Sequence, residues 1–411
     1  MERGSEIEHA LKEARAGLAV QNFGLAEFYA RNVLDLDPVH PDALALVGRI
    51  AVQFGIRDQA VSTLAAAHSI RAEPEIAALL QQAAALPMVE GRPNSLLVIK
   101  AWHAGFWAEV SHVLGALLLA DLTGRTPVTL WGSNCLYNDG STPDAFQLYF
   151  EGVSDVTAPD LVTLGGGDFF PAKWNEGNLF QGDHAKFKGE GARLPAFQFL
   201  ARKERIAVVD YHVGIPDLLG WIPSGHRLHG LPVEKIYRDL IDKYLRPTRA
   251  VMDQIDLMEA LLNLSEVELA IHIRGSDKAL EVSNLAKINA YYLEVLSKIH
   301  RGGRILLLTE DERLIPLFRE KYGDRVVVPP GERQSNGVPP HFRTGLNRVK
   351  VGMEAARDAY LASRTKKFLG NGRSNFSAMI PLLMAPSSES YLIRKNLLYE
   401  RNGFKFGMTG A

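Results

Sequence analysis

The chain has 411 residues, enough for two or three domains of about 100–200 residues each. Its 46 Lys and Arg balance 47 Asp and Glu at a pI of about 6.9, so no overall basic field attracts nucleic acid. The single cysteine, Cys135, excludes an intramolecular disulfide and a cysteine-rich zinc site. The charged amino terminus predicts no secretory signal, and the longest apolar stretch, 113–122, is too short to be an integral membrane segment. We therefore expect a cytoplasmic protein.

Residues 5–86 have a helical pattern, with Ala and Leu recurring at i, i+3 and i+4. Ala26 and Ala60 lie 34 residues apart in two similar segments, which end at Pro38 and Pro74. This period, with a small residue where two helices cross, is typical of tetratricopeptide repeats, and a generic helical bundle is the alternative. Because two copies are fewer than such arrays usually need, we expect these helices to pack on the next domain or on another subunit, as in a homo-oligomer.

After a linker at 88–95, strands alternate with helices, which predicts parallel sheets covered by helices. Residues 132–200 lack periodicity and are expected to form loops over a cleft. The expected strands are 95–102, 127–132, 205–214, 267–274, 304–311, 325–330, 367–372 and 390–393. The expected helices are 108–123, two within 232–263, and 288–300, 312–322, 346–363 and 375–384.

The expected fold class is therefore α/β, with two Rossmann-like lobes preceded by an all-α, tetratricopeptide-like region. We place the helical domain at 1–88, the first α/β lobe at 92–250 and the second at 251–400. Open α/β sheets bind ligands beyond the carboxyl ends of their strands, so we expect the site in the cleft between the lobes.

The segment AIHIRGSDK has the most informative polar pattern. His272 and Arg274 end a strand, Gly275 permits a sharp turn, and Asp277 and Lys278 follow in the loop. A guanidinium at a strand end can bind a diphosphate bidentately. In a sugar transfer it would stabilise the negative charge that grows on the leaving nucleoside diphosphate, without a metal. The alternative is that His272 and Arg274 satisfy each other or a carboxylate.

A second strand end carries LLLTED, in which Glu310 and Asp311 offer carboxylates for ribose or sugar hydroxyls. The alternative is an ordinary helix cap made by Thr309 or Asp311. A third strand end carries GNGRSNFS, where a glycine turn leads into a helix that starts near Ser374. Backbone N–H groups at a helix N-terminus suit a phosphate and Arg373 adds a cation, whereas a serine cap without a ligand is the alternative.

These three segments, in this order over about 110 residues, resemble the motifs of GDP-fucose fucosyltransferases. HIRGSDK is similar to the H-x-R-x-x-D-K motif of the α-1,6 type, which includes the nodulation and core fucosyltransferases. Many of those enzymes have a second arginine where this chain has Gly275, so the linkage stays open. The resemblance implies a GT-B fold, GDP-fucose as donor substrate and no metal or other cofactor.

The resemblance also implies roles for single residues. Arg274 would hold the diphosphate, with His272 near the nucleoside. Asp358 lies 16 residues before Ser374, a distance similar to that of a nucleotide-binding aspartate in the family. The implied donor-binding residues are His272, Arg274, Asp277, Lys278, Asp311, Asp358, Arg373, Ser374, Phe376, Ser377 and Gly105.

The first lobe contains AWHAGFWAEVSHVLG, similar to a glycine-rich loop that approaches the donor in several fucosyltransferase families. Gly105 permits close backbone approach. His103, His112 and His212 are expected on the acceptor side. Glu109 is a candidate catalytic group, although its place in a first helical turn also suits the helix dipole alone, and His112 also fits a core position.

An inverting transfer needs a carboxylate or imidazole near the acceptor hydroxyl. In the α-1,6 relatives a glutamate shortly after the Asp–Lys pair is a proposed base, and Glu281 is carried over on that ground, with Glu109 and His112 as rivals. The segment 339–343 is expected to line the guanine or acceptor side.

Three functions follow as hypotheses. The first is a metal-independent, inverting fucosyltransferase that acts on a glycan or protein acceptor. The second is a protein O-glycosyltransferase whose helical repeats select a polypeptide, with GDP-fucose or another nucleotide sugar as donor. The third is a non-catalytic scaffold with a degenerate sugar-binding unit. The chain has no H-x-x-x-H, C-x-x-C or G-x-x-x-x-G-K-[ST] segment, so we predict neither a metal site nor an ATPase.

Overall fold

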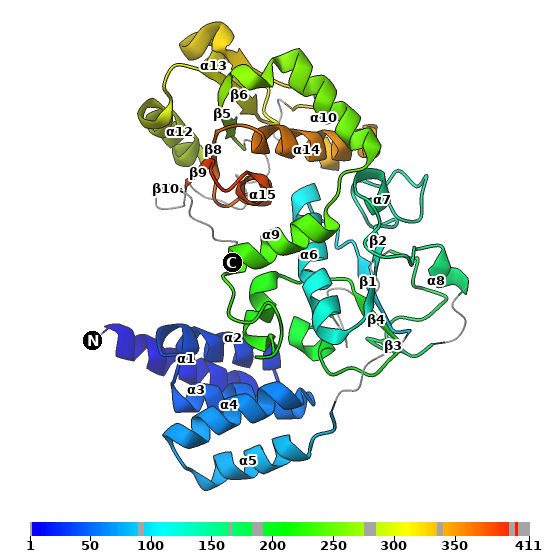
Figure 1. Cartoon of the computed structure of the whole chain (residues 1–411), viewed down its shortest axis with the longest axis vertical. Helices are drawn as coiled ribbons and strands as arrows, with labels where there is room; N and C mark the ends of the chain where they lie inside the picture. The colour runs from blue at the N-terminus through cyan, green and yellow to red at the C-terminus, as the bar shows by residue number, and fades with distance from the viewer. Residues whose placement is uncertain are drawn as a thin grey trace.

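The computed structural model describes residues 2–88, 94–163, 167–182, 192–274, 285–334, 340–393 and 399–401. It contains an all-helical region followed by two parts that each hold a sheet (Figure 1). We call these parts the helical region (α1–α5), the first lobe (β1–α9) and the second lobe (α10–β10). In Figure 1 the helical region lies at the bottom, the first lobe in the middle and the second lobe at the top.

The helical region contains α1 (Glu2–Ala19), α2 (Phe23–Leu36), α3 (Pro41–Gln53), α4 (Arg57–Ile70) and α5 (Pro74–Ala85). α1 packs on α2, and α3 packs on α4. Ala26 and Ala60, which occupy equivalent places in α2 and α4, are fully buried. A side chain at Gly48 would collide with Leu64, so α3 and α4 approach closely there. These observations support the tetratricopeptide-like interpretation, which stays a prediction.

The helical region packs against the first lobe. Phe197 and Trp221 of that lobe stack with ring centroids 5.1 Å apart, inside the apolar core of the helical region. Trp221 Nε1 donates to Glu27 Oε1 at 3.0 Å, and Arg31 Nη2 donates to the Gly220 carbonyl at 2.9 Å. Of the two expected packing partners, the next domain is therefore confirmed.

The first lobe contains β1 (Leu96–Lys100), α6 (Phe106–Thr123), β2 (Thr126–Leu130), α7 (Phe146–Tyr149), α8 (Asp160–Thr163), β3 (Phe169–Phe170), η1 (Ala196–Phe199), β4 (Ile206–Val209), η2 (Ile215–Trp221) and α9 (Val233–Tyr244). Its four strands are parallel, in the order β2-β1-β4-β3. Successive side chains of β1 face opposite layers. Leu97 and Ile99 pack in the cluster around α6, whereas Leu96 and Val98 pack with Trp174 on the other face.

α6 is the central helix of the first lobe. Within the described residues it alone is long and apolar enough to cross a membrane, and 89% of that stretch is buried inside the protein. β1, η2, α9, α14 and α15 all contact it, so its apolar character is accounted for by packing. Gly115 permits one of these contacts, because a Cβ there would collide with the carbonyl of Val213 before η2.

The second lobe contains α10 (Arg249–Leu262), η3 (Leu264–Glu266), β5 (Val267–His272), α12 (Leu285–Ile299), β6 (Arg304–Leu308), α13 (Leu314–Tyr322), η4 (Gly323–Arg325), β7 (Val326–Val327), η5 (Pro340–Phe342), α14 (Arg348–Ser363), β8 (Lys367–Asn371), α15 (Asn375–Leu383), β9 (Glu389–Ile393) and β10 (Tyr399–Arg401). The sheet order is β10-β9-β8-β5-β6-β7, and only the β10–β9 pair is antiparallel. Leu269 and Ile271 pack in the cluster that contains α12 and α13, whereas Ala270 packs in the cluster that contains α14 and α15. Helices therefore cover both faces, and the predicted α/β fold class is confirmed.

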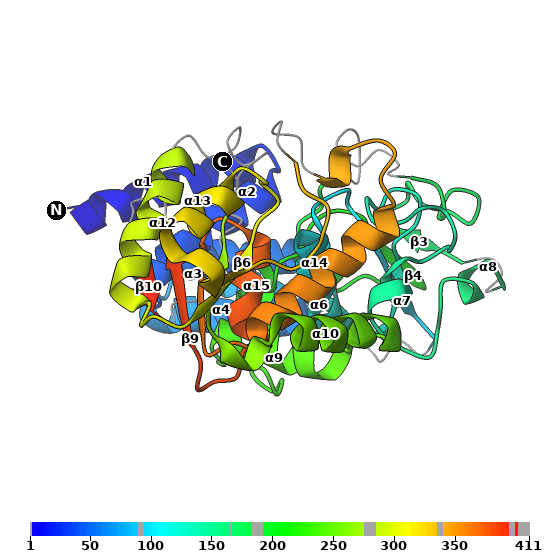
Figure 2. The same ribbon diagram turned by 90° about the horizontal axis from the view of Figure 1, so that it is seen from above.

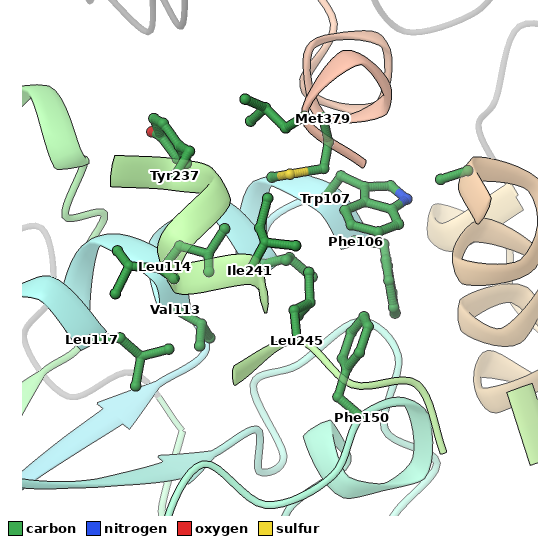
Figure 3. Close-up of a cluster of buried hydrophobic side chains, with 14 of the residues drawn as sticks. Phe106, Trp107, Val113, Leu114, Leu117, Phe150, Tyr237, Ile241, Leu245 and Met379 are labelled. Atoms are coloured by element: carbon green, nitrogen blue, oxygen red, sulfur yellow. The ribbon is translucent and has the colours of Figure 1, made fainter. Parts of the chain in front are cut away.

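One continuous apolar core joins the two lobes. Phe106 and Trp107 of α6 lie in it with Ile241 of α9 and Met379 of α15 (Figure 3). Trp107 Nε1 also donates to the Ala355 carbonyl of α14 at 2.9 Å. Figure 2 shows α14 beside α10, and α14 also contacts α6. A buried apolar interface of this kind fixes how the lobes face each other, and hence the shape of the space between them.

Several strands are shorter than the sequence predicts. β1 ends before Trp102, and β6 ends before Glu310 and Asp311, so these polar and aromatic residues lie in loops. β7 spans only two residues because Pro329 and Pro330, which lack an N–H group, follow it closely. β3 and β10 were not predicted. The domain bounds 1–88, 92–250 and 251–400 stay predictions.

Candidate active site

A cavity of about 430 Å³ lies between the two lobes. The second lobe lines it with the carboxyl ends of β5 and β6, one face of α14 and the start of α15. The first lobe lines it with the loop before α6 and the first turn of that helix. Its size and its place at strand ends suit a small-molecule ligand. The lining includes aromatic, charged and small residues: Trp102, His103, Gly105, Tyr137, His272, Arg274, Glu310, Glu332, Arg333, Phe342, Glu354, Asp358, Asn375 and Phe376.

Arg274 extends from the end of β5 into this cavity. Its Nε lies 3.8 Å from Oε1 of Glu310 at the end of β6, and the two side chains are 19% and 17% exposed. The neighbouring carboxylate keeps the guanidinium at the strand end, while its position on the cavity wall leaves it within reach of a ligand. A fork of N–H donors at this place suits an anion such as a diphosphate.

His272 lies beside Arg274 as the last residue of β5. Its Nδ1 is 2.7 Å from Ser377 Oγ, and its carbonyl accepts the Tyr292 hydroxyl at 2.9 Å. Burial, with a smaller effect of Arg274, lowers the pKa of His272 to about 3, so the imidazole is neutral near pH 7. The Phe376 ring packs on the imidazole of His272, with the ring centroids 4.4 Å apart. Ser377 is fully buried and orients His272 without lining the cavity itself.

Ser374 is the N-cap of α15, and its side chain is buried. Within the described part of the chain its Oγ has no hydrogen-bond partner, and Ser374 itself lies outside the cavity lining. Asn375 and Phe376 of the first turn line the cavity. Arg373 is exposed and lies outside the lining, so the structure does not bring it to the site. The start of α15 is thus suited to a phosphate group.

Asp358 and Arg333 bring further charged groups to the cavity. Burial raises the pKa of Asp358, and Arg357, whose Nε donates to its Oδ1 at 2.8 Å, opposes that rise. Burial lowers the pKa of Arg333, and its Nε has no partner among the described residues. Neighbouring donors and acceptors of this kind suit the polar edge of a nucleobase or a ribose.

The carboxylates of the cavity wall are held by cations or by backbone N–H groups. Glu354 accepts the N–H of Glu332 at 2.8 Å, and Glu332 in turn pairs with Lys350 at 2.8 Å. Among the residues described, no group of three or more His, Cys, Asp or Glu side chains is arranged to hold a metal ion. Among the described lining residues, Arg274 and Arg333 offer positive charge to an anionic ligand.

Glu109 holds the loop of the first lobe. Its carboxylate is fully buried and accepts the N–H of Trp102 at 3.0 and 3.1 Å and that of Ala104 at 2.8 Å. These bonds shape the loop that places Gly105 on the cavity wall. A carboxylate engaged in this way and shielded from the cavity does not fit a base, so the structure places Glu109 in a supporting position.

Of the three histidines predicted on the acceptor side, one lines the cavity and two lie outside its lining. His112 is fully buried: its Nδ1 accepts the Val213 N–H at 3.1 Å, so Nε2 carries the proton and donates to the Lys100 carbonyl at 3.1 Å. It ties α6 to β1 and to the residues that follow β4. Burial lowers the pKa of His212 to about 4, and this residue also lies outside the lining. His103 lines the cavity.

Asp311 does not reach the cavity, although its neighbour Glu310 does. Arg313 donates to both oxygens of Asp311, at 2.8 and 2.6 Å, and these bonds hold the pKa of that carboxyl low. Adjacent residues after a strand point in different directions, and the sequence alone did not show which carboxylate faces inward. Three further predicted residues, Asp277, Lys278 and Glu281, lie outside the described residues.

Sequence reasoning missed Arg333 and Tyr137. Arg333 follows β7, so the rule that ligands bind beyond strand ends would have indicated it. Tyr137 lies in the irregular stretch after β2 and reaches the cavity only through the packing of the lobes, which leaves no local signal. Phe342, within the predicted segment 339–343, lines the cavity.

No family model matches the sequence, and no curated protein matches it by sequence. Solved structures do match in three dimensions. NodZ α-1,6-fucosyltransferase co-crystallised with GDP aligns with a TM-score of 0.51 and 16% identity, covering 76% of this chain and 98% of that chain. The same enzyme soaked with GDP-fucose aligns with a TM-score of 0.50 and 16% identity, covering 76% of this chain and 99% of that chain. Fucosyltransferase NodZ from Bradyrhizobium aligns with the same TM-score and identity, covering 76% of this chain and 100% of that chain. The fold that the motif resemblance implied is thus confirmed: this chain has the fold of the NodZ α-1,6-fucosyltransferase over 76% of its length.

Proposed function

We propose that this chain is a glycosyltransferase that transfers fucose from GDP-fucose to a hydroxyl acceptor, with inversion and without a metal. The observation that carries this proposal is the position of Arg274, at the end of β5 on the wall of the interlobe cavity. The shared fold adds support, because the NodZ enzyme was co-crystallised with GDP and was also soaked with GDP-fucose. The ordered set of motifs around Arg274 argues against a degenerate, non-catalytic unit.

In this proposal the second lobe binds the donor. Arg274 holds the diphosphate, and the start of α15, where Asn375 lines the cavity, faces a phosphate oxygen. Asp358 and Arg333 face the nucleoside. His272, neutral and fixed by Ser377, offers Nε2 to a neutral group of the donor.

The proposed reaction is a single displacement. An acceptor oxygen bonds to C1 of fucose as the bond from C1 to the β-phosphate oxygen breaks, and the electron pair of that bond leaves with GDP. Negative charge grows on the departing diphosphate, where a fixed guanidinium stabilises it more than it stabilises the bound substrate. Two arginines on the cavity wall supply the positive charge that a metal supplies in other transferases.

The acceptor remains a glycan or a polypeptide in this proposal, and the reaction belongs in the cytoplasm. A groove of about 650 Å³ along α1, α3 and α5 favours a polypeptide acceptor as the second candidate function. Its rim carries Arg15, Arg49 and Arg71 with the acidic residues that pair with them, above an apolar floor. A grooved polar surface fits peptide selection better than self-association, which would need an exposed apolar stripe.

The proposed reaction is tested by NMR of GDP-fucose incubated with the protein in EDTA, with water as the acceptor. We expect GDP and free fucose whose first-formed anomer is opposite to that of the donor, because the displacement inverts C1. A product of retained configuration, or turnover that appears only when a divalent metal is added, would contradict the proposed mechanism.

A further inference from the structure

His103 combines an unusual backbone with a place on the cavity wall. Its φ is +67°, a left-handed conformation that is uncommon outside glycine. The other non-glycine residues with positive φ in the described chain are Gln21, Asn94, Arg193 and Asn263, and none of them lines the cavity. Backbone strain of this kind persists where the surroundings impose it, and it concentrates at functional sites.

Glu109 imposes this conformation. Its carboxylate binds the N–H of Trp102, directly before His103, and the N–H of Ala104, directly after it. Glu109 is itself fully buried in the first turn of α6, so the clamp is rigid. The backbone on both sides of His103 is therefore pinned to α6, and the imidazole is presented at the wall of the cavity instead of the core.

The tautomer of His103 is also set. Nδ1 lies 3.1 Å from the carbonyl oxygen of Asn134. A carbonyl only accepts, so Nδ1 carries the proton of the neutral ring and Nε2 keeps its lone pair. Asn134 is buried, and its amide donates to the Ala101 carbonyl, which fixes the partner in turn. A neutral imidazole with one nitrogen anchored and the other able to accept a proton is the arrangement of a general base.

Among the residues that the structure describes, the other titratable groups of the cavity fit this role less well, and Glu281 lies outside these residues. The carboxylates come from the second lobe, and Glu310, Glu332 and Asp358 each lie beside a cation: Arg274, Lys350 and Arg357. Glu354 accepts a backbone N–H. Tyr137, from the first lobe, accepts the Phe106 N–H at 2.8 Å, and burial raises its pKa. His272 lies on the donor side, and burial lowers its pKa to about 3.

We infer that His103 is the general base of the fucosyl transfer, an inference that rests on the proposed function. Its Nε2 takes the proton of the acceptor hydroxyl as that oxygen bonds to C1 of fucose. The C1–oxygen bond to the β-phosphate breaks at the same time, and its electron pair leaves with GDP near Arg274. Base and leaving group thus lie on different lobes, and an in-line displacement with inversion needs them on opposite faces of C1. Glu109 is a positioning residue that acts through His103.

The test uses His103→Asn, because asparagine tolerates positive φ and its amide can still donate to the Asn134 carbonyl. We expect GDP release from GDP-fucose, with water as acceptor, to fall about 100-fold or more, while the affinity for GDP is unchanged. His229→Asn is the matched control, because His229 also places Nδ1 on a carbonyl, that of Ile222 at 2.8 Å, but lies outside the cavity lining.

Azide provides an independent test of the general base. This anion attacks C1 without losing a proton, so its reaction does not need a base. Azide should restore turnover to His103→Asn and should leave Arg274→Ala slow. Wild-type rates in His103→Asn, or a slow variant that azide does not rescue, would overturn the role of His103 while the proposed function stands. A wild-type protein that binds GDP-fucose and releases no GDP would overturn it as well, whereas failure to bind GDP-fucose would remove the proposed function itself.

Discussion

Arg274→Ala is expected to lower kcat/KM for GDP-fucose by about 100- to 1,000-fold, the loss typical when a preorganised electrostatic group is removed from a transition state. Arg274 sits at the end of β5 on the cavity wall, and its Nε lies 3.8 Å from Oε1 of Glu310. Removing the guanidinium leaves Glu310 facing the departing diphosphate, and this repulsion adds to the lost attraction. GDP release measured at substrate concentrations well below KM gives the ratio directly.

Two further variants separate the role of Arg274 from a general effect of charge. Arg274→Lys keeps the charge but loses the planar pair of donors, so we expect an intermediate rate. Arg304→Ala is the matched control. Arg304 lies at the amino end of β6, away from the carboxyl ends of the strands where Arg274 lies, and it pairs with Glu266. If Arg274→Ala and Arg304→Ala turned over GDP-fucose equally fast, Arg274 would not bind the diphosphate.

Gly115→Ala is expected to destabilise the first lobe by about 3 kcal/mol or more, at the upper end of the range for overpacking. Gly115 lies in the middle of α6, where a Cβ would collide with backbone atoms of Val213 and Gly214. A clash with backbone is not relieved by a rotamer change, so α6 or the residues after β4 must move. The midpoint of urea unfolding, followed by tryptophan fluorescence, should fall clearly.

Gly105→Ala is the matched control for stability. It is the same substitution at the N-cap of the same helix, where a Cβ meets nothing within 4 Å. Its unfolding midpoint should stay close to that of the wild type. Equal midpoints for the two variants would show that α6 does not pack on the chain after β4 as the structure describes.

The sequence predicted most of the second lobe because each buried strand is a short apolar run that ends in polar residues. Arg274 and His272 could be placed because they end such a run, and the structure brings both to the cavity wall. Asp358 and Phe376 reach the same wall from helices. The motif resemblance indicated these two residues, whereas periodicity could not. A helical pattern shows which face of a helix is apolar, but it does not show which residue contacts a ligand.

Other parts of the site depended on contacts between distant segments. Nothing in the pattern around Glu109 shows that its carboxylate turns back onto the N–H groups of Trp102 and Ala104. Likewise, both ring nitrogens of His112 form hydrogen bonds, one with the Lys100 carbonyl and one with the Val213 N–H. These bonds form only when the strands are in place, so the local sequence does not predict them. Both residues were plausible as catalytic groups by type and spacing, and tertiary hydrogen bonds give them supporting roles instead.

The central claim is that the interlobe cavity is a guanine-nucleotide donor site. Isothermal titration calorimetry with GDP, UDP and CMP, in EDTA and on the full chain, tests it most directly. We expect GDP to bind to the wild-type protein without a metal, UDP and CMP to bind much more weakly, and Arg274→Ala to lose most of the GDP affinity. Preferred binding of UDP or CMP, or no binding of any nucleotide, would contradict it.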